Sequence, residues 1–220
     1  MIISHKHKFL IIAIPKTASN SIRKSLVPLG VIEEKVSPRP VCNDEFKQHG
    51  TISEAITEFN KRGWDYNDYF KYSIVRNPWD RYFSFLTYYK SKLEFYRNDN
   101  EPLNENKERQ KMNVVKRFDN KTYKEVLRDL IINNPSQMSY LIDSNNNIIM
   151  DRIGQLENIQ NDFNDFCQLV NLPKQQFPHR NKSSNLNINK KDLFTQELID
   201  MVAEKEKWAI NKFNYDFNLH

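Results

Sequence analysis

A lysine that follows a short apolar run is the first residue in this chain with a recognisable chemical use. Residues 9–14 are all apolar, which is typical of a strand buried on both faces. Lys16 follows this run, and the sequence from Ser21 onward is helix-like. The first turn of a helix has backbone N–H groups without partners and a partial positive charge, and Lys16 adds a full charge beside it. The sequence therefore predicts an anion-binding loop of the kind that holds phosphate.

A nucleoside triphosphate is the obvious ligand for such a loop. The Walker loop that binds it needs the pattern Gly-x-x-x-x-Gly-Lys-Ser/Thr, so that the backbone can wrap around the phosphates. In this chain no glycine precedes Gly30. The sequence therefore excludes a standard Walker loop.

Two blocks of sequence resemble a known family. Residues 14–22 read Ile-Pro-Lys-Thr-Ala-Ser-Asn-Ser-Ile and resemble the Pro-Lys-Thr-Ala/Gly-Gly-Thr-Ser block that opens the sulfotransferases. The second block is similar to the same family's strand end and helix start, and it reads Val75-Arg76-Asn77-Pro78-Trp79-Asp80-Arg81, with Ser84 in the helix. Weaker similarity continues through residues 152–158 and 178–183. Over nearly its whole length, the chain thus resembles the carbohydrate-type sulfotransferases that use 3′-phosphoadenosine-5′-phosphosulfate (PAPS).

This resemblance implies two groups of anion-binding residues, because PAPS has a reactive 5′-phosphosulfate and a separate 3′-phosphate. Lys16 would neutralise the charge that develops on the bridging oxygen as the S–O bond breaks. Arg76 and Ser84 would bind the 3′-phosphate. The 5′-phosphosulfate would be held by backbone amides and hydroxyl groups of the loop residues, which are Thr17, Ala18, Ser19, Asn20 and Ser21.

The chain departs from the family pattern at Ser19 and Asn20, where Gly-Thr is commoner. We expect binding to persist, because serine is small and asparagine can still donate a hydrogen bond.

A late segment and one carboxylate complete the resemblance. Arg180, Lys182 and Ser183 resemble a segment of the family that closes over the cofactor or acceptor, and they join the predicted cofactor-binding residues. The alternative interpretation, a solvated basic loop, stays open. Glu157 resembles a family glutamate that we interpret as structural, because a carboxylate beside an anionic cofactor would repel it.

A general base is also expected, because an acceptor hydroxyl must lose its proton as it attacks sulfur. Histidine suits this role, since its pKa lies near neutrality. His49 is the first candidate, because it lies in sequence between the two predicted anion-binding blocks and resembles a histidine that some family members use as base. The alternative for His49 is a histidine at a helix entry that hydrogen-bonds the backbone. His179 is the second candidate for the base, whereas His5, His7 and His220 lie near the termini.

The predicted reaction moves a sulfuryl group from PAPS to a hydroxyl, or an amine, of a carbohydrate or glycoconjugate acceptor and leaves 3′,5′-ADP. We expect no metal, because Lys16 and the loop amides can take its place. Two alternatives remain: a nucleotide or small-molecule kinase, weakened by the missing glycines, and a non-catalytic protein that binds polyanions on the same fold. The identity of the acceptor is not encoded, and its pocket is expected to come from residues 31–48, 97–111 and 174–189.

Bulk properties fit this prediction. The 220 residues, 39% of them hydrophobic, suit a single domain over residues 1–220. The net charge of +5 favours anionic ligands, but acidic and basic residues are interleaved, so no nucleic-acid partner is expected. Cys42 and Cys167 lie outside any metal-site or disulfide spacing and are interpreted as ordinary thiols. With neither a signal-peptide pattern nor an apolar run long enough to span a membrane, a cytoplasmic location is expected. The oligomeric state is left open.

The elements that must position these residues follow from periodicity. We predict strands at residues 9–14, 71–76 and 152–156, with further short strands at 34–36 and 148–150. Helices are predicted at residues 21–29, 53–62, from 78 onward, 121–133, after 158 and within 193–213, and polar loops at 97–111 and 174–189. The alternation predicts an α/β protein with a three-layer, P-loop-like fold, in which helices flank a central, mainly parallel sheet. Ligands of such sheets bind at the carboxyl ends of the strands, where both blocks lie.

Overall fold

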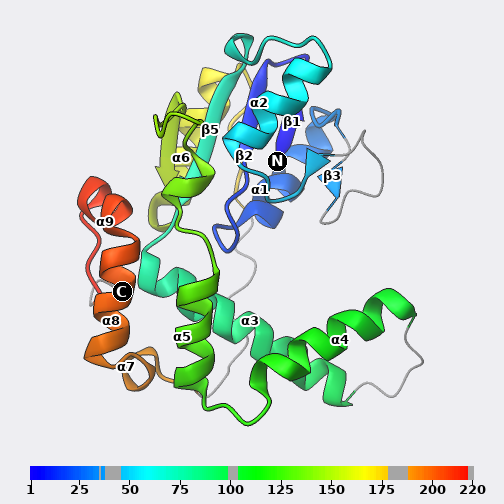
Figure 1. Ribbon diagram of the computed structural model, residues 1–220. Coiled ribbons are helices and arrows are strands. Elements are labelled where there is room, and N and C mark those ends of the chain that lie inside the picture. Colours follow the sequence, from blue (N-terminus) through cyan, green and yellow to red (C-terminus); the bar gives the residue numbers. More distant parts are fainter. Residues whose placement is uncertain (35, 38–45, 99–103, 178–187, 218–220) are drawn as a thin grey trace. The chain divides into compact units, whose positions relative to one another are not determined.

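The computed structural model describes residues 1–34, 36–37, 46–98, 104–177 and 188–217 (Figure 1). The chain divides into two compact units, each formed by two stretches of sequence. Unit 1 comprises Met1–Asn77 and Pro135–Arg180, and unit 2 comprises Pro78–Asn134 and Asn181–His220. The prediction of a single domain stays a prediction.

Unit 1 is built on a four-stranded sheet in the order β1-β2-β5-β6, with strands β1 (Ile2–Ser4), β2 (Phe9–Ile12), β5 (Phe70–Val75) and β6 (Arg152–Gln155). The pairs β2–β5 and β5–β6 are parallel, whereas β1 is antiparallel to β2. A separate parallel pair joins β3 (Val36–Ser37) to β4 (Phe46–Lys47). The α/β class and the mainly parallel central sheet are confirmed.

The described α-helices of unit 1 cover both faces of this sheet. Helices α1 (Ser19–Leu26) and α6 (Ile159–Leu169) share a core with Phe9, Ile11, Tyr72 and Ile74, which alternate along β2 and β5. The intervening residues of these strands point to the other face, where Figure 1 shows α2 (Ile52–Lys61) crossing in front of the sheet. Because both faces are covered, β2 reads as a continuous apolar run, whereas β5 is buried but includes Lys71 and Ser73.

Core burial also determines the state of one cysteine. Cys167 lies on α6 within the same core, and burial raises the pKa of its thiol to about 11. It is therefore an ordinary core thiol, as predicted, whereas Cys42 lies outside the described residues.

The regular elements among the described residues of unit 2 are all helices. Its helices are α3 (Pro78–Asn98), α4 (Glu105–Phe118), α5 (Tyr123–Asn133), α7 (Lys190–Leu193), α8 (Gln196–Lys205) and α9 (Lys207–Phe213). Helix α3 packs against α4, α5 and α8. Arg81 on α3 and Glu206, which lies between α8 and α9, form an ion pair of 2.8 Å in which both side chains are almost fully buried. Among the described helices of both units, none is long and apolar enough to cross a membrane.

Several predicted boundaries are wrong. The loop predicted for residues 97–111 contains the first half of α4, which begins after Asn104, whose side chain accepts a hydrogen bond from the Lys107 N–H at 3.0 Å. The strand predicted at 148–150 is only an isolated bridge between Ile142 and Ile148. Strand β1 was not predicted, and the helical stretch 193–213 is divided among the end of α7 and the separate helices α8 and α9.

Candidate active site

The two predicted anion-binding segments leave the same edge of the sheet. Strands β2 and β5 are parallel neighbours, with Ile12 opposite Ser73. The Ser73 hydroxyl also donates to the Ile12 carbonyl at 2.8 Å. The loop with Lys16 follows β2 and Arg76 follows β5, so both start at the carboxyl ends of adjacent strands, as expected for a ligand site in this class of sheet.

The loop has a tight backbone conformation without glycine. Lys16 and Ala18 both have positive φ angles, of 70° and 62°, in the region that favours glycine. The Thr17 side chain is buried, and its hydroxyl donates to the Ile14 carbonyl at 2.9 Å. This bond holds the turn together. Donation from the Thr17 hydroxyl to a ligand stays a prediction, and it would require this hydroxyl to give up its bond within the loop.

The first turn of α1 offers backbone donors. Ala18 is the N-cap and makes no side-chain capping bond, since alanine has no acceptor to offer. The N–H groups of Ser21 and Ile22 both donate to the Ala18 carbonyl, at 2.9 and 3.1 Å. The Ser21 amide therefore has a partner within the loop, and its predicted role toward a ligand stays a prediction. The amides of residues 17–20 precede the first bond of the helix, and they are the donors to which an anion could bind.

The loop side chains differ in their exposure. Ser19 is half-buried, Asn20 is exposed and Ser21 is buried. Of the two residues that depart from the family pattern, Asn20 is therefore the one that presents its side chain to solvent.

Lys16 is held in an environment that disfavours its charge. Burial, and after it the nearby positive charge of Arg76, together lower the pKa of its amine from 10.5 to about 8. The Arg76 guanidinium donates from Nη1 to the Lys16 carbonyl at 3.4 Å, so the two cationic residues lie side by side. Anionic groups bound beside the two residues would favour the charged form of Lys16, because they would offset both burial and the repulsion from Arg76.

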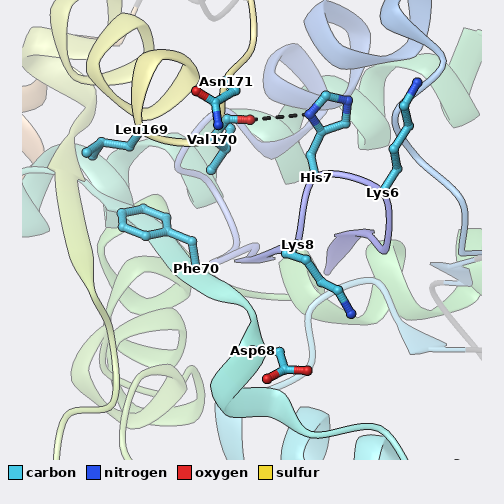
Figure 2. Close-up of a pocket in the computed structure, with 8 residues that line it drawn as sticks. All are labelled: Lys6, His7, Lys8, Asp68, Phe70, Leu169, Val170 and Asn171. Carbon is cyan, nitrogen blue, oxygen red and sulfur yellow. Dashed lines mark hydrogen bonds between the residues drawn. The ribbon is translucent and has the colours of Figure 1, made fainter.

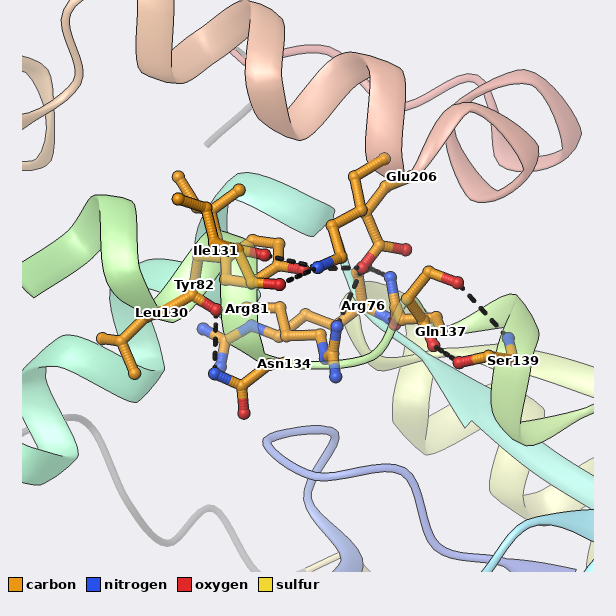
Figure 3. A network of polar contacts seen from close by, with 12 residues as sticks. Arg76, Arg81, Tyr82, Leu130, Ile131, Asn134, Gln137, Ser139 and Glu206 are labelled. Carbon is orange, nitrogen blue, oxygen red and sulfur yellow. Dashed lines mark hydrogen bonds and ion pairs between the residues drawn. The ribbon is translucent and has the colours of Figure 1, made fainter.

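Arg76 is fixed by a glutamine that the sequence analysis did not identify. Gln137 is fully buried, and its side-chain oxygen accepts from the Arg76 N–H at 2.8 Å while its nitrogen donates to the Arg76 carbonyl at 2.9 Å (Figure 3). The two residues are 61 positions apart in sequence. No local pattern could have indicated this pairing.

The next residue along the chain is held in a related way. The Asn77 N–H donates to Glu157 Oε1 at 2.7 Å, and Glu157 follows the carboxyl end of the neighbouring strand β6. Glu157 therefore makes a structural contact, in agreement with its interpretation from sequence.

His49 is hydrogen-bonded to the backbone between β2 and the loop. Its Nδ1 lies 2.7 Å from the carbonyl oxygen of Ala13, three residues before Lys16. Because a carbonyl only accepts hydrogen bonds, Nδ1 carries the proton in the neutral ring, and the basic lone pair is on Nε2. His49 is exposed and lies two residues before Thr51, the N-cap of α2. The geometry thus suits both a base and a helix-entry histidine.

The remaining predicted residues lie elsewhere in the chain. Ser84 is half-buried on α3 of unit 2, and its pairing with Arg76 stays a prediction. His179, Arg180, Lys182 and Ser183 lie outside the described residues.

The residues around Ser84 have structural contacts within unit 2. Trp79 is buried and donates from Nε1 to the Ile199 carbonyl at 3.2 Å. Asp80 pairs with Lys190 at 2.8 Å, and Arg81 pairs with Glu206. These charge pairs connect α3 to segments of the unit that are distant in sequence.

A hollow of about 390 Å³ lies at the opposite edge of the sheet (Figure 2). Lys8 and Phe70, at the amino ends of β2 and β5, line it together with Lys6, His7, Asp68, Leu169, Val170 and Asn171. The His7 ring is directed to the Val170 carbonyl, with Nδ1 3.3 Å from the oxygen. The described lining residues include none of those predicted for the site, so this hollow is separate from the loop.

Comparison with known proteins identifies the family of the chain. A family model described as "Sulfotransferase family" matches residues 1–219. No curated protein and no solved structure gives a match.

Proposed function

The chain belongs to the sulfotransferase family, and from this premise we propose that it uses PAPS as donor and sulfates a hydroxyl of a carbohydrate or glycoconjugate. The observation that carries the choice of donor is the juxtaposition of Lys16 and Arg76 at the carboxyl ends of β2 and β5. Two cations from neighbouring strands suit a nucleotide with two separate anionic groups better than a ligand with one.

The residues of the loop fit the 5′ end of such a donor. The N-cap of α1 is an alanine without a capping bond, so its first amides lack the side-chain acceptor that serine or aspartate would supply. An anionic oxygen can take that position, and the partial positive charge of the helix end favours it. When bound, PAPS supplies an activated sulfuryl group and a phosphate leaving group.

Each residue then has a defined task. Lys16, in its protonated form, stabilises the negative charge of the leaving phosphate, and the amides of residues 17–20 hold the same group. His49 accepts the acceptor's proton at Nε2, while its Nδ1–H bond to Ala13 keeps the ring oriented. Arg76 binds the 3′-phosphate, and the part of Ser84 in this contact stays the prediction drawn from the sequence. The sulfuryl group passes directly from donor to acceptor, so no covalent intermediate on the protein is required, and the proton is left on His49.

Two observations support this assignment over a kinase. The loop contains no glycine, and its positive φ angles occur at Lys16 and Ala18 rather than at the glycines of a Walker loop. The alternative of a non-catalytic polyanion binder gives His49 no task, although its Nδ1–H bond orients the ring as a base requires.

Calorimetric titration of the full chain with 3′,5′-ADP, ATP and heparin tests the proposal. We expect 3′,5′-ADP to bind at least tenfold more tightly than ATP, with little change between 50 and 200 mM salt relative to a polyanion-binding protein. Preference for ATP would point to the kinase. Binding of heparin alone, with a steep dependence on salt, would point to the polyanion binder.

Turnover of labelled PAPS with a panel of neutral and acidic saccharides then tests the acceptor class. Transfer to saccharide hydroxyls is the expected result. Transfer only to non-saccharide alcohols or to amines would overturn this part of the proposal while leaving the choice of donor intact.

A further inference from the structure

Arg76 is the first residue after β5, where the backbone pairing of the sheet ends. The ladder between β5 and β6 ends with the pair Val75 and Gln155, and the ladder between β2 and β5 ends with Ile12 and Ser73. Arg76 follows directly, so its backbone N–H and carbonyl groups must find partners outside the strand pairs. The side chain of Gln137 satisfies both of them, at 2.8 and 2.9 Å.

Gln137 is itself well fixed. It precedes the short 3₁₀ helix Met138–Tyr140, and its carbonyl accepts from the Tyr140 N–H at 3.2 Å. Its side chain is fully buried, which makes the two bonds to Arg76 more valuable, because a buried amide without partners would be costly. A primary amide is the side-chain group that donates and accepts in one plane, so it imitates the edge of a neighbouring strand.

Two bonds to one residue fix both the position and the orientation of that residue. The Arg76 side chain starts from this point and extends to the Lys16 carbonyl. We propose that Gln137 is a positioning residue of the donor site, which directs the Arg76 guanidinium onto the 3′-phosphate of the nucleotide. The inference rests on the proposed use of PAPS, and it adds to it a residue that contacts no ligand but determines where Arg76 can bind one.

Nucleotide binding by full-chain variants, measured by calorimetry, tests this role. Gln137→Met removes both hydrogen bonds at similar volume, and we expect it to raise the Kd for 3′,5′-ADP about tenfold, since two hydrogen bonds are involved. The Kd for 5′-AMP, which differs only in lacking the 3′-phosphate, should change by less than about threefold. A general loss of structure would weaken both nucleotides alike.

A double-variant cycle with Arg76→Ala makes the test specific. Once the guanidinium is absent, Gln137→Met should weaken 3′,5′-ADP binding no further, because Gln137 acts through the Arg76 side chain. Additive losses in the double variant would overturn the inference, and so would an unchanged Kd in Gln137→Met.

Gln160 offers a matched control. Its side chain also bridges two backbone groups, donating to the Gln175 carbonyl at 2.8 Å and accepting from the Phe177 N–H at 2.9 Å. Gln160→Met should leave the binding of both nucleotides unchanged.

Further results distinguish a failure of the proposed Gln137 role from a failure of the proposed donor. If Gln137→Met does not fold, Gln137→Glu retains the acceptor for the Arg76 N–H and loses the donor, and a selective loss of 3′,5′-ADP affinity is again expected. If the wild-type chain fails to bind 3′,5′-ADP at all, the proposed donor is wrong and the inference falls with it. If the wild type binds and the variants lose no selectivity, the role of Gln137 alone is wrong.

Discussion

At the scale of single residues, the amine of Lys16 must be protonated to bind an anion, but its surroundings in the folded chain favour the neutral form. Its pKa is lowered to about 8, first by burial and then by Arg76. Because the protonated amine is the form that binds an anion, the Kd for 3′,5′-ADP should be lowest below pH 8 and rise above it, by up to about tenfold per pH unit. Binding at pH 8 should also take up protons, which calorimetry in two buffers of different ionisation enthalpy measures. Binding without proton uptake at this pH would contradict the role of Lys16.

The same lowered pKa has a consequence for stability. Between about pH 8 and 10.5 the unfolded chain binds the extra proton, so this residue makes the folded state more stable as the pH rises through that interval. At pH 7 the buried charge therefore destabilises the fold. Lys16→Met should abolish nucleotide binding and raise the thermal midpoint of the free protein by about 2–4 °C, equivalent to about 1 kcal/mol after allowance for solvent screening.

The control for this comparison is Lys24→Met, at an exposed position of α1. It should leave both the thermal midpoint and the binding of 3′,5′-ADP close to wild type. A thermal midpoint lower in Lys16→Met than in the wild type would show that the charge of Lys16 does not destabilise the folded state.

The base can be tested without disturbing its orientation. In His49→Asn, the amide can still donate to the Ala13 carbonyl but cannot accept a proton. We expect kcat to fall by about 10²–10⁴-fold, with the Kd for 3′,5′-ADP nearly unchanged. His7→Asn is a matched control, because His7 also directs Nδ1 to a backbone carbonyl, at the opposite edge of the sheet. Full activity of His49→Asn would exclude His49 as the base.

The sequence predicted those site residues that follow directly from a strand or precede a helix. Lys16 follows the apolar run 9–14 after one proline, Arg76 follows Ile74 and Val75, and the order of the sheet makes their strands neighbours. The contacts of Gln137 and of the Thr17 hydroxyl could not be predicted in this way. The first depends on a pairing across 61 positions, and the second on a loop geometry that no residue type specifies.

At the scale of elements, the loop between β2 and α1 has an alanine at a position whose backbone conformation favours glycine. Ala18 has φ 62° and ψ 23°, a left-handed conformation that is unfavourable for residues with a Cβ atom. Ala18→Gly should stabilise the free protein by about 0.5 kcal/mol, because relief of this strain outweighs the greater freedom of glycine in the unfolded chain. Urea denaturation measures the change. Destabilisation by more than about 0.5 kcal/mol would show that the alanine methyl group has a packing role that outweighs the strain.

The elements predicted correctly are those with a strong local signal. Strand β2 is a continuous apolar run, β5 ends in Ile74 and Val75, and α5 has a capping box between Thr122 and Glu125. Helix α4 was missed because it is mostly polar and only Val114 is buried among its residues, so its burial depends on Leu93 and Tyr96 of α3. Strand β1 was missed because its three residues are too few to show a period.

At the scale of the whole molecule, each unit has its own means of stabilisation. Unit 1 has the apolar core around the sheet, whereas unit 2 contains the buried pair of Arg81 and Glu206. Glu206→Gln removes one partner and leaves the Arg81 charge buried, so it should destabilise the protein by about 3–5 kcal/mol. Urea denaturation followed by tryptophan fluorescence would detect this, because Trp79 and Trp208 report on unit 2.

An exposed pair in the same unit provides the comparison. Arg128 and Glu197 are paired with side chains 42% and 60% exposed, and Glu197→Gln should change stability by less than about 1 kcal/mol. Similar losses in Glu197→Gln and Glu206→Gln would mean that burial of the Arg81 pair has no special effect.

The bonds between Gln137 and Arg76 also bear on how the chain folds. They join two points of unit 1 between which residues 78–134 run through unit 2, and the same excursion separates β5 from its neighbour β6. Bringing such distant segments together is slow, because the entropy of closing the loop is lost before the strands can pair. Helices α3 and α5 lie within that excursion and pack against each other. If these helices formed early, fewer flexible residues would separate β5 from β6, and the entropy lost on pairing the two strands would be smaller. The helical unit would thereby speed formation of the sheet that carries Lys16 and Arg76.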